Sequence, residues 1–143
     1  GVFGFLINPP LALFYIQGLN TTAVHAHTAL FGVYGFLALG FVWLVALYIY
    51  KDKNFDDTLM KIGFWALNAG LLLMVLISLL PVGILQAFAA IDVGMWYARS
   101  AEFLQKDSLY GLRWARIIGD TIFLVGSVCF LLQIVRMIFS RAK

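Results

Sequence analysis

Charged side chains are scarce in this chain of 143 residues, and none occurs before Lys51. Only 12% of the residues are Asp, Glu, Lys or Arg, whereas a soluble domain carries about 25%. With 63% hydrophobic residues, the composition excludes a soluble globular protein and indicates an integral membrane protein. The net charge of +3 does not indicate nucleic-acid binding, because the basic residues lie at the ends of apolar runs and form no stripe.

Cysteine and histidine are nearly missing as well. The single cysteine, Cys129, excludes an internal disulfide, and its place within an apolar run indicates a buried, inert thiol. The only histidines are His25 and His27, which lie near the start of a long apolar run. An unsatisfied polar group in an apolar medium costs several kcal/mol, so each imidazole needs a partner.

Three apolar runs are long enough to cross a membrane, which takes about 20 residues. We expect helices from about residue 22 to 50, 59 to 80 and 109 to 138. The apolar stretch before Pro9 and Pro10 is too short to span, and we expect it to be the end of a preceding helix. The sequence therefore predicts an all-α fold. It is a polytopic transmembrane helix bundle with three full spans plus the end of a preceding helix, in a single region of a longer polypeptide.

Local residue patterns predict where these helices begin and bend. Residues 20–22 contain Asn and Thr side chains that can cap the first span, and Asp57 or Thr58 can cap the second. Pro81 is expected to kink the second span or end it, although the apolar pattern continues to Ala90. Amide side chains within the spans are expected to hydrogen-bond between helices: Asn68, Gln86 and Gln133.

The distribution of basic residues predicts the orientation of the bundle. Cytoplasmic ends of membrane helices carry an excess of Lys and Arg. The first loop, the start of the second span and the C-terminal tail hold more of them than the opposite side does. We therefore expect the first loop and the C-terminus to be cytoplasmic and the histidines to lie toward the outer face. The first group is Lys51, Lys53, Lys61, Arg136, Arg141 and Lys143, and the second is Arg99, Lys106, Arg113 and Arg116.

The spacing of the two histidines limits what they can bind together. A helix turns about 100° per residue, so side chains two residues apart point about 200° apart, on nearly opposite faces. One metal ion cannot be held by both, because chelation on a helix uses residues four apart. Two large cofactors, one on each side of the helix, could each take one imidazole, and haem with a proximal histidine meets that requirement. Hydrogen bonds from His25 and His27 to neighbouring helices are the alternative.

The sequence around the histidines resembles the haem-copper oxidase superfamily, whose catalytic subunit carries a His-x-His pair. The closer similarity is to the bacterial nitric oxide reductases, through GVFGFLINPP at residues 1–10 and HAHTALFGVYG at 25–35. The string NTTAVHAH at 20–27 is most similar to the quinol-dependent branch, and WYARS at 96–100 and RIIGD at 116–120 also resemble the family. By this resemblance the chain is the last part of a larger catalytic subunit with the twelve-helix type of fold.

The resemblance implies a role for each histidine. His25 would be the catalytic proximal ligand of the high-spin b haem iron, and His27 an axial ligand of the low-spin b haem iron. No further histidine exists in the chain, so the ligands of the family's non-haem iron must lie outside this segment. The implied enzyme, in the bacterial cytoplasmic membrane, reduces nitric oxide to nitrous oxide with electrons from quinol. The segment alone, without the remainder of the catalytic subunit, is expected to be inactive.

The charged residues on the same side of the membrane as the histidines each have two possible roles. Arg99, Arg113 and Arg116 could pair with haem propionates or extend to the membrane interface, and Arg113 and Arg116 share a helix face. Asp120 stands about ten residues into the last span, where an ionisable group is costly and often functional. It could form an ion pair with Arg116 or border a quinol pocket near the low-spin haem.

Two alternatives to a nitric oxide reductase remain open from the sequence. One is a related haem-copper oxygen reductase, which would hold copper in place of non-haem iron. The other is a non-redox membrane helix bundle in which His25 and His27 only form hydrogen bonds. A haem spectrum would distinguish the non-redox bundle from the two haem enzymes. Metal analysis would distinguish an oxygen reductase, with copper, from a nitric oxide reductase, with non-haem iron.

Overall fold

The computed structural model describes residues 2–51 and 56–140, and every regular element within these ranges is a helix. This confirms the all-α prediction. Three of the basic residues that predict the orientation lie outside the described residues: Lys53, Arg141 and Lys143. The elements are α1 (Val2–Ile7), α2 (Pro10–Ile16), α3 (Asn20–Ala26), the π-helix η1 (His27–Gly35), α4 (Phe36–Ile49), α5 (Thr58–Met74), the π-helix η2 (Val75–Leu79), α6 (Leu80–Asp92), the 3-10 helix η3 (Tyr97–Arg99), α7 (Ala101–Leu104) and α8 (Asp107–Phe139).

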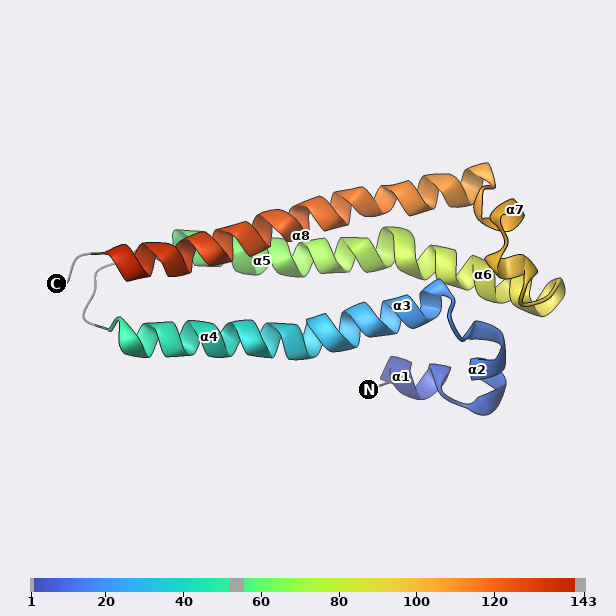
Figure 1. Cartoon of the computed structure of the whole chain (residues 1–143), viewed down its shortest axis with the longest axis horizontal. Coiled ribbons are helices and arrows are strands. Elements are labelled where there is room, and N and C mark those ends of the chain that lie inside the picture. The colour runs from blue at the N-terminus through green and yellow to red at the C-terminus, as the bar shows by residue number, and fades with distance from the viewer. Residues whose placement is uncertain (1, 52–55, 141–143) are drawn as a thin grey trace.

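Three continuous helices are long and apolar enough to cross a membrane: Asn20–Ile49, Thr58–Asp92 and Asp107–Phe139. They confirm the three predicted spans, and α1 is the short preceding helix. At 1.5 Å per residue each reaches about 45 Å or more, against a hydrocarbon core of about 30 Å, so each must tilt or protrude. The second and third spans lie side by side, most closely where α8 follows α5, and the first runs beside them (Figure 1).

Glycine allows the backbones of α5 and α8 to touch. A Cβ atom on Gly70 would lie 2.5 Å from the backbone nitrogen of Phe123. One on Gly119 would lie 2.5 Å from the backbone nitrogen of Met74. Small residues at such crossings permit the close packing on which helix association in lipid depends. The α5–α8 pair is therefore the scaffold of the bundle.

The first span begins without the side-chain cap that was predicted for it. Helix α3 starts at Asn20 with Leu19 at the N-cap position, and no side chain there bonds a backbone N–H of the first turn. The hydroxyls of Thr21 and Thr22 instead donate to the carbonyl of Ile16, at 3.4 Å and 3.3 Å. They are committed to the turn that joins α2 to α3, so the capping prediction was wrong.

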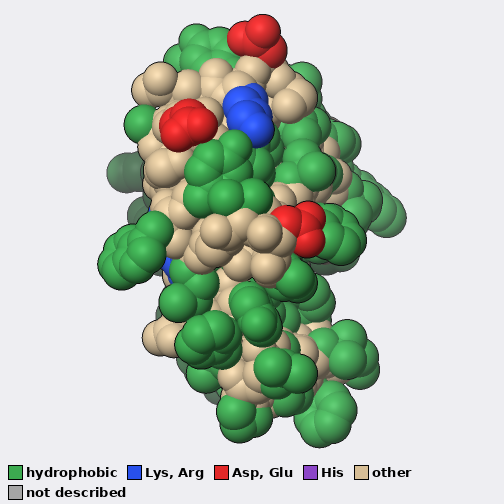
Figure 2. Space-filling model, turned by 90° about the vertical axis from the view of Figure 1, so that its right-hand side faces the viewer, with side chains coloured by type: hydrophobic (Ala, Val, Ile, Leu, Met, Phe, Trp, Pro, Cys, Tyr) green, Lys and Arg blue, Asp and Glu red, His purple; other side chains and the backbone are tan. Residues whose placement is uncertain are grey.

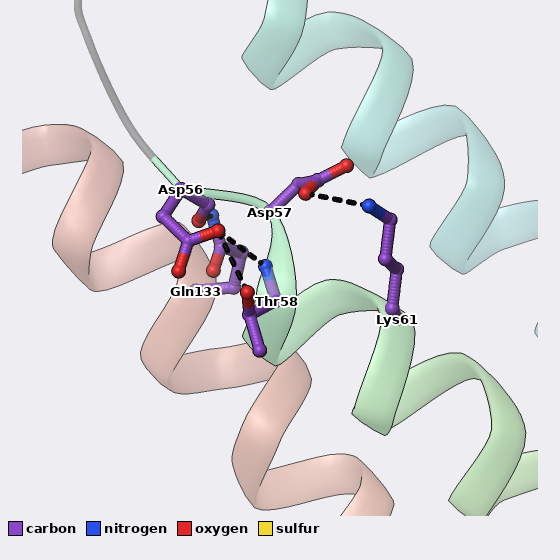
Figure 3. A network of polar contacts seen from close by, with 5 residues as sticks. All are labelled: Asp56, Asp57, Thr58, Lys61 and Gln133. Atoms are coloured by element: carbon purple, nitrogen blue, oxygen red, sulfur yellow. Dashed lines mark hydrogen bonds and ion pairs between the residues drawn. The ribbon is translucent and has the colours of Figure 1, made fainter.

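The second span begins in a polar network at the opposite end of the bundle (Figure 3). Oδ1 of Asp56 accepts hydrogen bonds from the backbone nitrogen and the hydroxyl of Thr58, at 3.1 Å and 2.7 Å. Gln133 of α8 donates to the Asp56 carbonyl at 2.9 Å, and Lys61 pairs with Asp57 at 3.0 Å. The start of the helix was predicted, but the capping carboxylate is Asp56 and not Asp57.

Pro81 does not end the second span, which continues to Asp92. The π-helix η2 lies immediately before α6, and Pro81 occupies the first turn of α6. A proline has no N–H to donate, and its ring clashes with the carbonyl four residues earlier, here that of Ile77. The wider π turn accommodates this ring, and the chain stays helical.

The connection between α6 and α8 closes the histidine end of the bundle. The surface at this end is largely hydrophobic, with a few charged side chains among apolar ones (Figure 2). Trp96 within this connection is 84% exposed. An exposed tryptophan is typical of the membrane interface, where one edge of the ring is wet and the other is apolar.

Candidate functional site

The two histidines lie at the junction of α3 and η1 and contact different helices. The His25 ring lies against α1, because a Cβ on Gly4 would come within 2.8 Å of His25 Cε1. The His27 ring lies against α8, with Nε2 at 3.4 Å from Nη2 of Arg116. These contacts agree with the opposite directions expected from the two-residue spacing.

The hydrogen bonds of His27 define which ring nitrogen carries the proton. Nδ1 lies 2.8 Å from the carbonyl oxygen of Ala23, and a carbonyl can only accept, so Nδ1 donates. Nε2 is then left with a lone pair, which faces a guanidinium that can only donate. An imidazole oriented through Nδ1 to a backbone carbonyl presents Nε2 in the form that binds a metal.

A threonine explains where η1 begins. The hydroxyl of Thr28 donates to the carbonyls of Val24 at 2.7 Å and His25 at 3.3 Å. It competes for carbonyls that an α-helix would pair with backbone N–H groups, and such competition favours a local change of helix type. π-Helical turns inside longer helices are frequently found at functional sites. The helix type therefore changes at His27, the second histidine of the pair.

Arg116 links His27 to Asp120. Its Nε lies 3.2 Å from Oδ1 and 3.1 Å from Oδ2 of Asp120, and both side chains are about 40% exposed (39% and 43%). The ion pair predicted as one reading of Asp120 therefore forms. The same guanidinium contacts His27, so the carboxylate of Asp120 lies one side chain away from the imidazole.

A cavity of about 450 Å³ opens along α8 beside this ion pair. Arg113 and Arg116 both line it, as expected for residues three apart on a helix. Its walls combine aromatic side chains with cations and a carboxylate, so it can receive a planar group that carries hydrogen-bonding atoms. The lining residues are Gln105, Tyr110, Arg113, Trp114, Arg116, Ile117 and Asp120.

Arg99 and Arg113, the other two predicted propionate partners, donate hydrogen bonds to backbone carbonyls. Arg99 donates to the carbonyl of Met95 at 2.7 Å and to that of Gln17, and so joins the α6–α8 connection to the turn before α3. Arg113 donates to the carbonyl of Leu104 at 3.2 Å. A guanidinium has five N–H donors, so these bonds leave others for an anion. The sequence did not indicate that Arg99 joins two segments through hydrogen bonds to their carbonyls. The pairing of these arginines with haem propionates stays a prediction.

A second cavity, of about 490 Å³, lies between the first and second spans and is almost entirely apolar. Residues four apart on the first span line it, and a Cβ on Gly32 would lie 3.3 Å from Cδ2 of Leu71 on the second span. This four-residue spacing was the sequence feature that could have revealed it. Its lining residues are Thr28, Gly32, Phe36, Trp65, Asn68, Ala69, Leu71, Leu72 and Val75.

Residues 2–51 and 56–140 contain no group of three or more His, Cys, Asp or Glu side chains able to hold a metal ion. Neither His25 nor His27 therefore belongs to such a group within this part of the chain. A single axial ligand is what a haem iron requires of a helix, because the macrocycle supplies the other nitrogens.

Residues 1–122 match the family model of cytochrome c and quinol oxidase polypeptide I. The chain belongs to this haem-copper oxidase family. No curated protein sequence gives a significant match. The match includes both histidines, the three arginines and Asp120. Membership of the haem-copper oxidase superfamily indicates an oxidoreductase in the membrane, from a family that generally binds haems, and it disfavours a non-redox bundle.

Proposed function

We propose that this haem-copper oxidase chain is a single region, 1–143, of the catalytic subunit of a quinol-dependent nitric oxide reductase. In this proposal His25 would hold the iron of the high-spin b haem, and His27 would be one of the ligands of the low-spin b haem iron, whose second ligand lies outside this segment. The observation that supports it most strongly is the contact of the two imidazoles with different helices, α1 and α8. Ligation of two separate haems from one helix needs this divergence.

The surroundings of His27 fit a haem ligand, whereas the Cε1 and Nε2 edge of the His25 ring faces Gly4 of α1. His27 offers an Nε2 lone pair because its Nδ1 donates to the Ala23 carbonyl. Arg116 uses that same lone pair, so its guanidinium must move aside when iron is bound, while Asp120 can keep it nearby. His25 packs on a glycine, Gly4, whose missing side chain leaves room for the ring.

When bound, the haems and a non-haem iron supply the redox chemistry, in which two NO, two electrons and two protons give N₂O and water. The non-haem iron would be held by residues outside this segment. The chain itself contributes the two imidazoles and the short path between them, since only Ala26 separates His25 from His27. It also contributes the guanidinium of Arg116, and those of Arg99 and Arg113 nearby, as partners for propionates.

The cavity on α8 is the proposed quinol site. Oxidation of a quinol to a quinone releases two electrons and two protons, so the site needs a proton acceptor near the first electron acceptor. Asp120 lines the cavity, and Arg116 lies between its carboxylate and His27. Trp114 and Tyr110 supply aromatic walls for a planar headgroup.

The proposed enzyme spans the bacterial cytoplasmic membrane with the C-terminus on the cytoplasmic side. Its partners are the remainder of the catalytic subunit, quinol, nitric oxide and membrane lipid. The basic residues at the far end from the histidines support this orientation. Residues of the histidine end would then lie near the outer face.

Metal analysis and NO consumption by the full subunit test the proposal. We expect two b haems and one non-haem iron per subunit, no copper, and NO reduction with quinol as donor. Copper in place of non-haem iron would assign the chain to an oxygen reductase. A full subunit without a haem spectrum would favour the alternative in which His25 and His27 only form hydrogen bonds.

A further inference from the structure

A buried amide, Gln86 of α6, holds the start of the histidine helix. The side chain is 5% exposed, and its Oε1 accepts a hydrogen bond from the backbone nitrogen of Asn20 at 3.0 Å. Its Nε2 donates to the carbonyl of Ala98 in η3 at 3.1 Å. One side chain thus joins three segments: α6, the first residue of α3 and the connection that follows α6.

Closely packed backbone surrounds this amide. A Cβ on Gly83, one turn before Gln86, would lie 2.6 Å from the backbone nitrogen of Thr21, so α6 and α3 are in direct contact. Leu19 and Ala98 beside the amide are 3% and 0% exposed. Because α3 has no side-chain cap of its own, the Gln86 oxygen serves the first N–H of the helix from outside.

We propose that Gln86 is a positioning residue for the two imidazoles, a role that rests on the proposed haem ligation. Asn20 precedes His25 by five residues, or about 7.5 Å along one helix. Ala23, whose carbonyl orients the His27 ring, belongs to the same short stretch. A displacement or rotation of α3 at Asn20 therefore changes the direction of both imidazole rings.

A second buried amide provides a matched control at the other end of the bundle. Gln133 of α8 is 0% exposed, and its Nε2 donates to the carbonyl of Asp56 at 2.9 Å. Like Gln86 it ties a helix to a chain segment before another helix, but it lies near the first loop and not near the histidines (Figure 3). Loss of either amide removes at least one hydrogen bond of a buried side chain, so a general packing effect should appear in both variants.

The test uses the full subunit with Gln86→Met, Gln86→Asn and Gln133→Met. Methionine keeps the length and volume of glutamine without its hydrogen bonds, and asparagine is too short to reach both partners. For each variant we would record the thermal midpoint, the electron paramagnetic resonance of the low-spin haem, its reduction midpoint and NO turnover. We expect both Gln86 variants to shift the resonance and the reduction midpoint and to lower turnover about tenfold, the size seen for groups that orient metal ligands.

Gln133→Met should lower the thermal midpoint and leave the haem resonance and potential at parental values. Parental haem signals in Gln86→Met, or in Gln86→Asn where the first variant does not fold, would overturn the positioning role. Equal shifts in the Gln133 variant would also overturn it. A parallel His27→Ala variant separates the two proposals, because retention of its low-spin resonance contradicts the haem assignment whatever the Gln86 variants show.

Discussion

The helix that carries the histidines and the helix pair that supports it are held in different ways. Within its most apolar 18-residue window, the first span has 6% of residues buried, whereas the second has 44%. The α5–α8 contact is close enough for backbones to touch, while α3 is held chiefly at its start by α6. The comparison teaches that the three spans are not equivalent: the α5–α8 pair supplies the scaffold, and the first span leaves most of its surface exposed.

The largest effect should follow from removing the proposed ligand of the high-spin haem. His25→Ala in the full subunit is expected to abolish NO turnover, because no other histidine can replace it except His27, which points to α8. Turnover with quinol measures the loss. The control is Gly40→Ala on the same span. An added Cβ there meets nothing within 4 Å, so turnover should equal that of the parent. Residual turnover in the His25 variant would place the essential chemistry elsewhere.

A smaller effect is expected at the cavity on α8. Asp120→Asn should slow quinol-driven turnover roughly a hundredfold, as for loss of a proton-transfer group, and leave turnover with an artificial electron donor intact. Asp57→Asn breaks the other i,i+4 ion pair, with Lys61, at the far end of the bundle and should change neither rate. Equal losses with both donors in the Asp120 variant would indicate a structural ion pair only.

The scaffold itself can be tested through its glycines. Gly119→Ala places a Cβ 2.5 Å from the backbone nitrogen of Met74, so α5 and α8 must separate, at a cost of about 1–3 kcal/mol in the free energy of unfolding. Gly111→Ala on the same helix meets nothing within 4 Å and should be neutral or stabilising by up to about 1 kcal/mol. Thermal unfolding of the full subunit in detergent distinguishes them. Equal midpoints for the two variants would contradict the close contact.

The smallest effect concerns the polar network before α5. The hydroxyl of Thr58, and then its backbone N–H, hold the pKa of the Asp56 carboxyl below its ordinary value. Asp56 therefore contributes stability above its unfolded pKa, and this contribution is lost as the pH falls through its lower folded pKa. The difference in thermal midpoint between the parent and Asp56→Asn should be small at neutral pH and vanish in acid. A difference that grows on acidification would contradict the hydrogen-bond assignment.

Features that depend on one segment at a time were predictable from the sequence. The three spans follow from the lengths of apolar runs, and the divergence of His25 and His27 follows from helix geometry. Contacts with partners from far along the chain were not predictable. The acceptor for the first N–H of α3 is 66 residues away, at Gln86, and the guanidinium beside His27 is 89 residues away.

Competing hydrogen bonds explain the other differences. Thr21 and Thr22 were good candidates for a cap, but the carbonyl of Ile16 takes their hydroxyls. Asn68 was expected to bond another helix, and its Nδ2 donates instead to the carbonyl of Phe64 one turn earlier, at 2.8 Å. Gln86 does bond another helix as expected, at Asn20 of α3, whereas Gln133 bonds the carbonyl of Asp56 in the segment before α5. A sequence pattern does not show which of two available acceptors a short polar side chain will choose.

The most direct test of separate haem ligation is the haem spectrum of two single variants of the full subunit. We predict that His25→Ala keeps the low-spin resonance and optical bands, and that His27→Ala loses them while the high-spin haem is retained. A folded variant of either kind that loses both haems would contradict ligation from opposite sides of one helix. Spectra exchanged between the two variants would reverse the assignment of the ligands.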